Sequence, residues 1–409
     1  MARPKTKNPL DRLVNFRLTS AEFSAMEKET NAAGFDSLSD YIRHLRKSHS
    51  ESNSALAVKE SESLYGIEEP RLFEKTEFGQ IYHGDCLGLL HHTIKPNSVD
   101  LIVTSPPFGL VRKKSYGNED ADDYVEWFKP FAAGMKRVLK EQGSLVIDIG
   151  GAWKPGHPTR SLYHFELLIS LCRDFGFHLC QEHYWWNPSK LPTPAEWVNI
   201  RRVRVKDAIN CIWWLSKSPW PKASNKRVLS PYSPSMKSLL KNGYTPKLRP
   251  SGHDISDKFS IDNGGAVPPN LLAIANTESN GAYQEYCRAN KLPVHPARFP
   301  GRLPEYFIRL LTDEKDLVVD PFGGSCVTGE VAESLKRKWA CCELNESYLK
   351  GARARFVGLK PKIPRPDGAV YQIYPPCSLN GHADTSPLAK DGGFKRVKKK
   401  ATGNRLNLV

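Results

Sequence analysis

The sequence predicts an α/β protein with a Rossmann-like parallel sheet and helices on both of its faces. Short apolar runs are separated by helical patterns, and each run leads into a loop of unusual composition. Continuous apolar runs of this length are typical of strands buried on both sides of a parallel sheet. The four clearest runs are Val99–Val103, Ser144–Ile149, Leu317–Val319 and Trp339–Cys342. Ligands bind beyond the carboxyl ends of such strands, which is where the unusual loops follow.

Composition limits the classes of protein to consider. The chain has 409 residues, 40% of them hydrophobic, and a net charge of +15. Without an apolar run near the roughly 18 residues that span a bilayer, no membrane association is expected, and we expect a cytoplasmic protein. Nine cysteines without a CxxC pair predict neither a metal site nor a disulfide framework. The positive charge favours a polyanionic partner such as nucleic acid, although a basic surface without a partner has the same composition.

Four regions are expected along the chain. Residues 1–50 form a small unit, residues 51–72 a polar linker and residues 73–359 the main domain. Residues 360–409, rich in Pro, Gly and Lys, are expected to be a basic disordered tail.

The N-terminal unit combines a strand pattern with two helix patterns. Val14, Phe16 and Leu18 alternate with Asn15, Arg17 and Thr19, and helices are expected from Ser20 and from about Ser37. This order resembles the ribbon-helix-helix family, in which two chains share one core and lay a ribbon in the major groove. The resemblance implies a homodimer in which Asn15, Arg17 and Thr19 face bases. The alternative is a helical hairpin packed on the main domain.

A rigid loop, Thr104-Ser-Pro-Pro-Phe108, follows the first strand run. Pro106 and Pro107 cannot continue a strand, and they fix the direction of the loop carbonyls. The Ser105 hydroxyl and the Pro106 carbonyl can accept hydrogen bonds from an exocyclic amino group, and Phe108 offers a flat face to an extruded base. The alternative is a tight Pro-Pro turn with a buried phenylalanine.

A glycine-rich loop, Asp320-Pro-Phe-Gly-Gly-Ser325, follows the third strand run and precedes a helix expected over Glu330–Arg337. Gly323 and Gly324 let the backbone approach a ligand closely. Asp320 can bind an ammonium group, and Glu343 after the next strand suits ribose hydroxyls. This unit favours a nucleoside cofactor over a structural turn. ATP and NAD fit less well, because the Walker lysine and a GxGxxG motif are absent.

These two loops resemble the catalytic and cofactor motifs of DNA methyltransferases that act on amino groups, in the order of the beta class. The similarity covers about residues 78–357 and is greatest to the PvuII-type cytosine-N4 family, with Ser in place of Asp before Pro-Pro. Further similar segments are Ser105–Lys114, Trp185–Pro192, Arg249–Asp254 and His295–Pro300. The resemblance implies a Rossmann-like S-adenosylmethionine-dependent methyltransferase fold with a DNA-recognition insert. It further implies methyl transfer to cytosine N4 in double-stranded DNA, within the palindrome CAGCTG, and a cognate restriction endonuclease encoded nearby.

By position, the resemblance assigns a role to each site residue. Asp85 would bind the adenine amino group of the cofactor, Asp320 its methionine end and Glu343 its ribose. Asp148 would support Ser105, and the segment Arg298–Pro304 would begin a helix over the methionine part. The predicted catalytic set is Ser105, Pro106, Pro107, Phe108 and Asp148, and the predicted cofactor set is Asp85, Asp320, Phe322, Gly323, Gly324, Ser325 and Glu343. Cys326 and Val327 depart from the family pattern, which puts the close approach of helix and cofactor in doubt.

Residues 193–290 are the expected target-recognition region, because basic and aromatic residues alternate there. Arg201, Arg202 and Lys206 are the candidate DNA contacts. The run Ile209–Leu215 within this region is expected to be a core strand, which makes its tryptophans structural.

The sequence is also compatible with two other functions. One is an adenine-N6 methyltransferase of the same fold. The other is a noncatalytic DNA-binding regulator, against which the intact Ser105, Asp320 and Glu343 argue. An RNA target is also compatible with the sequence.

Overall fold

The computed structural model of the chain describes residues 20–35, 37, 38, 41, 66–109, 120–243, 260–276 and 281–356. The predicted base contacts Asn15, Arg17 and Thr19 lie outside these residues. So do the motif Arg249–Asp254 and the region 360–409.

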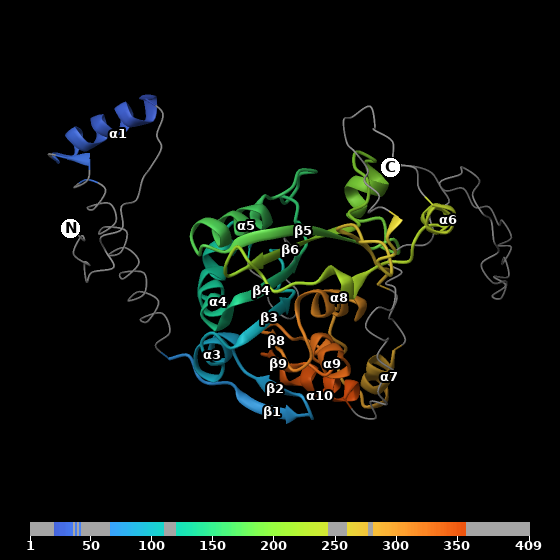
Figure 1. Cartoon of the computed structure of the whole chain (residues 1–409). Coiled ribbons are helices and arrows are strands. Elements are labelled where there is room, and N and C mark those ends of the chain that lie inside the picture. The colour runs from blue at the N-terminus through green and yellow to red at the C-terminus, as the bar shows by residue number, and fades with distance from the viewer. Residues whose placement is uncertain are drawn as a thin grey trace, which may run out of the picture.

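The centre of the protein is a sheet of nine strands in the order β1-β2-β9-β8-β3-β4-β6-β5-β7 (Figure 1). In chain order the strands are β1 (Arg71–Lys75), β2 (Gly79–His83), β3 (Val99–Thr104), β4 (Leu139–Ile149), β5 (His178–Trp186), β6 (Ile209–Ser216), β7 (Leu271–Ala273), β8 (Leu317–Asp320) and β9 (Lys338–Glu343). All four predicted strand runs are confirmed.

The sheet is mixed, whereas the sequence predicts a parallel one. β2, β9, β8, β3 and β4 are parallel, but β1 is antiparallel to β2, and β6 is antiparallel to both β4 and β5. A run of buried apolar residues fits either direction, so the pattern of Ile209–Leu215 predicts a core strand but not its orientation. β6 and β7 also lie inside the range 193–290. Part of the predicted target-recognition region therefore belongs to the central sheet, and the role of the region in DNA recognition stays a prediction.

Two groups of helices cover the two faces of the sheet. The helices and short helical turns are α1 (Ser20–Ala32), α3 (Cys86–Gly88), η1 (Leu89–Thr93), α4 (Tyr124–Val138), α5 (Tyr163–Arg173), η2 (Glu196–Ile200), η3 (Asn225–Val228), α6 (Pro234–Asn242), α7 (Ala282–Ala289), α8 (Arg302–Leu311), α9 (Val327–Ser334), α10 (Glu346–Ala352) and η5 (Arg353–Arg355). α3, α4 and α5 lie on one face, and α8, α9 and α10 lie on the other (Figure 1). Strand residues alternate between the two cores: Leu145 and Ile147 join the first, and Val146 joins the second.

The central strands meet at a topological switch point. From β3 the chain passes through α4 to β4 on one side, and from β8 it passes through α9 to β9 on the other. α4 and α9 pack on opposite faces, so the loops after β3 and β8 lie side by side at the strand ends. Open α/β sheets bind ligands at this kind of position.

The helix after β8 starts earlier than predicted. α9 begins at Val327 and ends at Ser334, instead of covering Glu330–Arg337. Cys326 and Lys336 adopt left-handed backbone angles, with φ of 57° and 58°. These two left-handed residues lie at the two ends of the helix. Neither is a Gly or an Asn, the residues that usually occupy such a position.

The first helix of the N-terminal unit is present where it is predicted. α1 covers Ser20–Ala32, and Gly34 after it has a φ of 77°. The Phe35 and Tyr41 rings lie 5.6 Å apart, centroid to centroid. The preceding strand pattern lies outside the described residues, so the ribbon-helix-helix assignment stays a prediction. No helix in the described ranges is long and apolar enough to cross a bilayer.

Candidate active site

A buried carboxylate joins the two loops at the switch point. Asp320 ends β8 and is 2% exposed. Its Oδ1 accepts from the Thr104 hydroxyl at 2.7 Å, and its Oδ2 accepts from the Thr328 hydroxyl at 2.6 Å. The Phe322 amide also donates to Oδ1, at 3.2 Å. Asp320 therefore links the end of β3 to the first turn of α9.

Burial has an electrostatic cost for Asp320. Desolvation raises its pKa to about 6, although the hydrogen bonds from Thr328, Thr104 and Phe322 oppose the shift. The carboxylate braces the two loops, a role that the sequence did not predict. Its contact with the methionine end of a cofactor stays a prediction.

Ser105 lies at the head of a second hydrogen-bonded chain. Its hydroxyl donates to Asp148 Oδ2 at 3.1 Å, and the Asn210 side-chain amide donates to Asp148 Oδ1 at 3.1 Å. Asp148 is near the end of β4, and Asn210 reaches it from the neighbouring β6. Because the Ser105 hydroxyl donates its hydrogen bond to Asp148, the lone pairs of the Ser105 oxygen are available to accept a hydrogen bond from a substrate.

Asp148 is also nearly inaccessible, at 5% exposed. Desolvation raises its pKa to about 6, and the hydrogen bonds from Asn210 and Ser105 and the charge of Lys190 hold the rise down. At neutral pH the carboxylate is ionised, which strengthens the bond that it accepts from Ser105.

The Pro-Pro segment is held by a buried tyrosine. The Tyr124 hydroxyl donates to the Pro107 carbonyl at 2.7 Å, and Tyr124 is fully buried at the start of α4. Among the described residues none donates to the Pro106 carbonyl. The loop thus keeps Pro106 and Ser105 as its two neighbouring acceptors.

Phe108 packs on the backbone that follows β4. A Cβ placed on Gly150 would lie 2.6 Å from the Phe108 ring, so only glycine allows this contact. The Tyr163 hydroxyl donates to the Gly150 carbonyl and holds that backbone from α5. Phe108 is half-buried and packs against the core under α4 and α5.

The predicted ribose residue is held in place at the end of β9. Glu343 Oε2 accepts from the Gly324 amide at 3.0 Å, and Oε1 accepts from the Asn345 amide at 2.8 Å. The Gly323 amide donates to the Cys342 carbonyl at 2.7 Å. These bonds bring the glycine-rich loop against β9. Burial raises the pKa of Glu343, and its backbone hydrogen bonds oppose that shift.

Asp85 lies beyond the neighbouring strand β2. Its Oδ1 caps α3 by accepting from the Leu87 amide at 2.8 Å, and the residue is exposed. Gly84 before it donates its amide to the Glu343 carbonyl at 3.1 Å. Asp85 and Glu343 are therefore on adjacent strand ends, as a nucleoside site requires.

Two residues of the predicted cofactor set have protein partners. Ser325 is 2% exposed, and Arg355 donates to both its carbonyl, at 2.6 Å, and its hydroxyl, at 3.1 Å. Arg355 also pairs with Glu330 at 2.5 Å. Phe322 packs beside Phe131, with ring centroids 5.3 Å apart. The Ser325 side chain therefore stabilises the loop, and the Phe322 ring reaches the core under α4.

The candidate DNA contacts Arg201, Arg202 and Lys206 are all exposed, on the connection between β5 and β6. Arg201 pairs with Glu196 at 2.7 Å and lies over the Trp197 ring. Lys206 donates to the Lys190 carbonyl at 3.0 Å. Trp213 is buried in the sheet, as expected for a structural tryptophan.

Sequence reasoning assigned no role to Asn210, Tyr124, Thr104, Thr328 or Arg355. The threonines stand inside the motifs and could have been recognised as donors to a buried strand-end carboxylate. Asn210 is 62 positions from Asp148 and carries no local signal.

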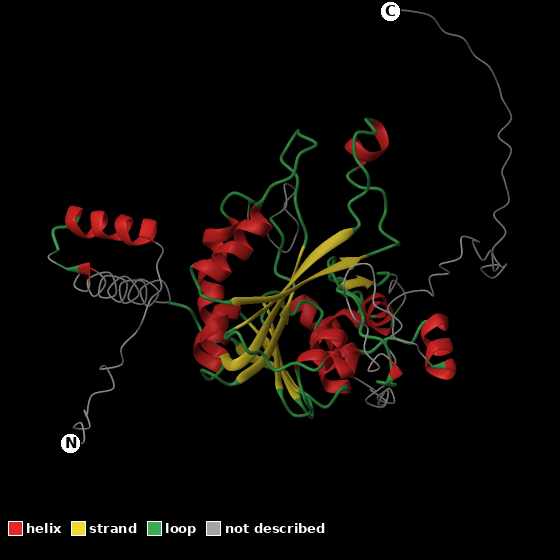
Figure 2. Cartoon of the chain, turned by 45° about the horizontal axis from the view of Figure 1, so that its top comes forward, coloured by secondary structure: helices red, strands yellow, loops and turns green. Residues whose placement is uncertain are grey.

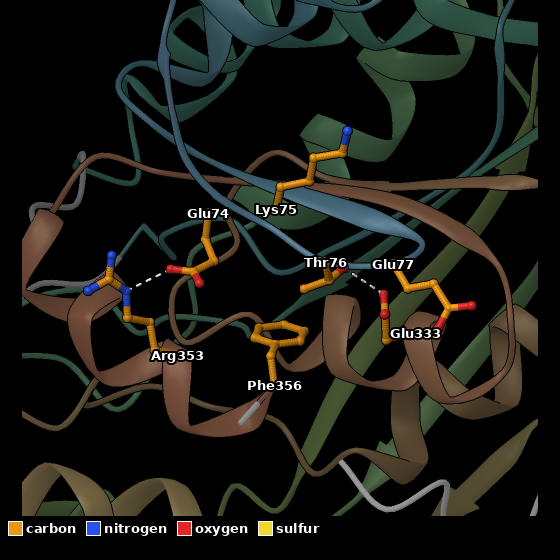
Figure 3. Close-up of a pocket in the computed structure, with 7 residues that line it drawn as sticks. All are labelled: Glu74, Lys75, Thr76, Glu77, Glu333, Arg353 and Phe356. Carbon is orange, nitrogen blue, oxygen red and sulfur yellow. Dashed lines mark hydrogen bonds and ion pairs between the residues drawn. The ribbon is translucent and has the colours of Figure 1, made fainter. Parts of the chain in front are cut away.

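A cavity of about 270 Å³ lies elsewhere (Figure 3). It opens between the β1–β2 turn and α9, at the amino ends of β2 and β9, and its residues include Glu74, Glu77, Glu333 and Arg353. Arg353 pairs with Glu74 at 2.7 Å, and Thr76 donates to Glu333 at 2.8 Å. It is at the opposite end of the strands from Ser105 and contains none of the predicted site residues.

Comparisons with known proteins agree with this geometry. A family model described as DNA methylase, N6_N4_Mtase, matches residues 99–354. The Type II methyltransferase M.PvuII of Proteus hauseri is 52% identical over 285 residues, which are 69% of this chain and 84% of that protein. The DNA adenine methyltransferase YhdJ of Escherichia coli (strain K12) is 27% identical over 286 residues, 68% of this chain and 83% of that protein. Among solved structures, the PvuII DNA methyltransferase (cytosine-N4-specific) matches with a TM-score of 0.56 and 42% identity, covering 71% of this chain and 92% of that one.

Proposed function

This chain belongs to the DNA methylase family of N6- and N4-methylating enzymes, and from that premise we propose that it methylates cytosine N4 at a specific site in double-stranded DNA. The methyl donor is S-adenosylmethionine. The relative M.PvuII is a Type II methyltransferase, and its solved counterpart is named cytosine-N4-specific. The observation that carries the proposal is the bond from Ser105 to Asp148, because it leaves the serine oxygen as an acceptor beside the Pro106 carbonyl.

The residues at the strand ends fit the methyl donor. Each Glu343 oxygen accepts one backbone amide and keeps a further lone pair, so the carboxylate can accept the two ribose hydroxyls. The exposed Asp85 on the adjacent strand can accept from the adenine amino group. When bound, S-adenosylmethionine supplies an electrophilic methyl group on a positively charged sulfur.

The protein prepares the cytosine amino group for attack. The lone pair of an exocyclic nitrogen is delocalised into the ring, which makes it a weak nucleophile. The Ser105 hydroxyl oxygen and the Pro106 carbonyl oxygen accept hydrogen bonds from its two N–H groups and draw the nitrogen toward tetrahedral geometry. Asp148 holds the Ser105 hydroxyl in the accepting orientation, and Asn210 holds Asp148.

Adenine N6 is the second candidate target, because YhdJ is named as an adenine methyltransferase. The two functions separate in one experiment. DNA from a host that expresses the chain is digested to nucleosides and analysed by mass spectrometry. We expect N4-methylcytosine, and N6-methyladenine as the only product would overturn the proposal. Sequencing of the modified bases with their flanks tests the palindrome CAGCTG.

Residues 1–50 are proposed to form a ribbon-helix-helix unit that dimerises the enzyme, and a cognate endonuclease and a cytoplasmic location are part of the same proposal. α1 and its closing Gly34 support the unit. Deletion of residues 1–50 tests it by light scattering: we expect a monomer that still methylates DNA. A dimer that survives the deletion would contradict this part of the proposal.

A further inference from the structure

The connection between β5 and β6, residues 187–208, is the most unusual surface of the described protein, and we call it the β5–β6 excursion. It leaves the sheet after Trp186 and returns at Ile209. In Figure 2 it projects away from the sheet as a loop that carries a short helix, η2. Its base is closed by the Asn187 amide, which donates to the Ala208 carbonyl at 2.8 Å.

The excursion has its own internal structure. Trp197 is 8% exposed, and its carbonyl accepts from the amides of Val203 and Arg204 at 2.9 and 3.2 Å. The Asp207 amide donates to the Thr193 carbonyl at 3.0 Å. Asp207 also pairs with Arg204 and with Arg160, which reaches it from the turn after β4. A segment held by so many bonds presents its outer side chains in a defined arrangement.

Those outer side chains are aliphatic. Val205 is 85% exposed, Leu191 74%, Ile200 70% and Val203 61%. Exposed apolar surface that gathers in one place marks interaction sites, and these four exposed residues all belong to one connection. The Trp197 side chain provides the small core of the excursion without them.

Basic residues alternate with the aliphatic ones along the excursion. The excursion has five basic residues, Lys190, Arg201, Arg202, Arg204 and Lys206, and two acidic residues, Glu196 and Asp207. Both acids are paired with arginines of the chain. A net positive charge together with exposed aliphatic side chains fits duplex DNA, which presents both phosphates and a stack of apolar base faces.

The excursion also lies next to the catalytic carboxylate. The charge of Lys190 lowers the pKa of Asp148. Asn210, two residues beyond the excursion, donates directly to Asp148. Arg160, which pairs with Asp207, packs on Gly151, where a Cβ would lie 2.0 Å from its guanidinium. An element at this place can reach the gap that a base leaves when it enters the site.

We propose that three exposed aliphatic residues of the β5–β6 excursion, Ile200, Val203 and Val205, which we call the tip, insert into the DNA base stack in place of the extruded cytosine and hold the duplex open. The proposal rests on the proposed function, since it assigns a surface to the base extrusion that this function requires. Apolar side chains that enter base steps offset part of the cost of unstacking. Three exposed basic residues beside them in the sequence, Arg201, Arg202 and Lys206, which we call the charged rim, bind the flanking phosphates.

The test compares two substrates and two matched double variants. The tip variant is Ile200→Ala with Val205→Ala, and the control is Leu72→Ala with Ile169→Ala, which removes the same kind of exposed aliphatic groups from β1 and α5. One duplex has the target cytosine paired with guanine, and the other has it opposite an abasic site. The second substrate lacks most of the cost of extrusion.

We expect the tip variant to lose about 10- to 100-fold in kcat/KM on the paired duplex, since unstacking a base step costs a few kcal/mol. On the abasic duplex it should be within about threefold of the wild type, and the control should match the wild type on both substrates. A fluorescent base analogue at the target position should be less emissive with the tip variant than with the wild type.

Two results would overturn the proposal. One is an equal loss on both substrates, which would place the tip in the chemistry or in general DNA binding. The other is full activity on both, which would leave the tip for another partner. If the wild type itself forms no N4-methylcytosine on either duplex, the proposed function fails instead. The replaced side chains are between 48% and 85% exposed, and the melting temperatures of the variants check that folding is unchanged.

Discussion

The switch point and the β5–β6 excursion differ in how they use polar groups. At the switch point the carboxylates of Asp320 and Asp148 are buried and are bonded to hydroxyl, amide and backbone donors. In the excursion four aliphatic side chains are exposed, and both acidic side chains are paired with arginines. Folded proteins usually expose charged groups and bury aliphatic ones. The switch point instead buries charged groups, and the excursion instead exposes aliphatic ones.

Each of these two departures has a different physical use. A buried carboxylate whose lone pairs are bonded to fixed donors cannot reorient, which is what a site needs when it must hold one oxygen against a reacting nitrogen. An exposed aliphatic side chain is free to enter another molecule. The comparison therefore predicts that changes at the switch point alter the chemical step, and changes in the excursion alter the handling of DNA.

The largest effect is expected at Ser105. Replacement Ser105→Ala removes one of the two acceptors, and kcat for methyl incorporation should fall by about 10²- to 10³-fold, as for other lost transition-state hydrogen bonds. Binding of S-adenosylmethionine, followed by calorimetry, should change by less than about twofold. Ser189→Ala, in the exposed part of the excursion, is the matched control and should leave kcat unchanged. An active Ser105→Ala enzyme would remove the basis of the comparison.

The pH dependence of the rate comes next. The pKa of Asp148 is about 6 because of burial, so the single-turnover rate should fall about tenfold per pH unit below that value as the carboxylate is protonated. Asn210→Ala removes a donor that lowers this pKa, and the acidic limb should move to higher pH. A structural role of Asn210 alone would lower the rate without moving the limb.

Stability should change in the opposite direction over the same range. The raised pKa means that the folded protein binds the Asp148 proton more tightly than the unfolded chain does. This contribution to stability is fully present below the ordinary pKa of 3.8 and is lost as pH rises through about 6. Asp148→Asn should therefore unfold at the same or a higher temperature than the wild type at pH 8 while being inactive. A lower melting temperature at pH 8 would show that the ionised carboxylate stabilises the fold.

A moderate effect is expected for the hydrogen bonds that the buried Asp320 accepts from Thr104 and Thr328. Thr328→Val leaves one oxygen of the buried Asp320 without its hydroxyl donor, and the free energy of unfolding should fall by about 1–3 kcal/mol. Urea denaturation measures this loss. Thr159→Val, at an exposed position, is the control and should change the same quantity by less than about 0.5 kcal/mol. Equal losses would mean that the hydrogen bonds of Asp320 do not stabilise the fold.

The smallest effect is expected at the charged rim. Arg202→Gln should weaken duplex binding about uniformly across sequences and reduce the slope of log Kd against log salt by about 1. The value of kcat at saturating DNA should not change. Fluorescence anisotropy at several salt concentrations measures the slope. An unchanged slope would exclude Arg202 from phosphate contact.

The sequence predicts the parts of the site but not how they are joined. Runs that end at Thr104 and Asp320 give the strands and loops correctly, because apolar runs and glycine- or proline-rich loops are local signals. The partners of these residues are not local: Thr104 is 216 positions from Asp320, and Asn210 is 62 from Asp148. These contacts depend on the order of the strands in the sheet and on the antiparallel direction of β6. Neither produces a periodic pattern of apolar residues in the sequence.

Helix ends illustrate the same limit on a smaller scale. α9 starts three residues before its predicted start, directly after Cys326, which is fully buried and has a left-handed backbone conformation. The same residue was expected to weaken the cofactor loop. It is fully buried there, and the loop keeps its hydrogen bonds to β9.

The bonds of Asp320 to Thr104 and Thr328 have a consequence for the gene. The first bond joins the neighbouring strands β3 and β8, the second joins β8 to α9, and neither depends on which strand is translated first. A rearranged gene that encodes the β8–α9–β9 half before the β3–α4–β4 half would specify the same contacts, provided that new connections span the distance. These contacts therefore require the two halves to pack together, and they do not require one order of the halves along the chain.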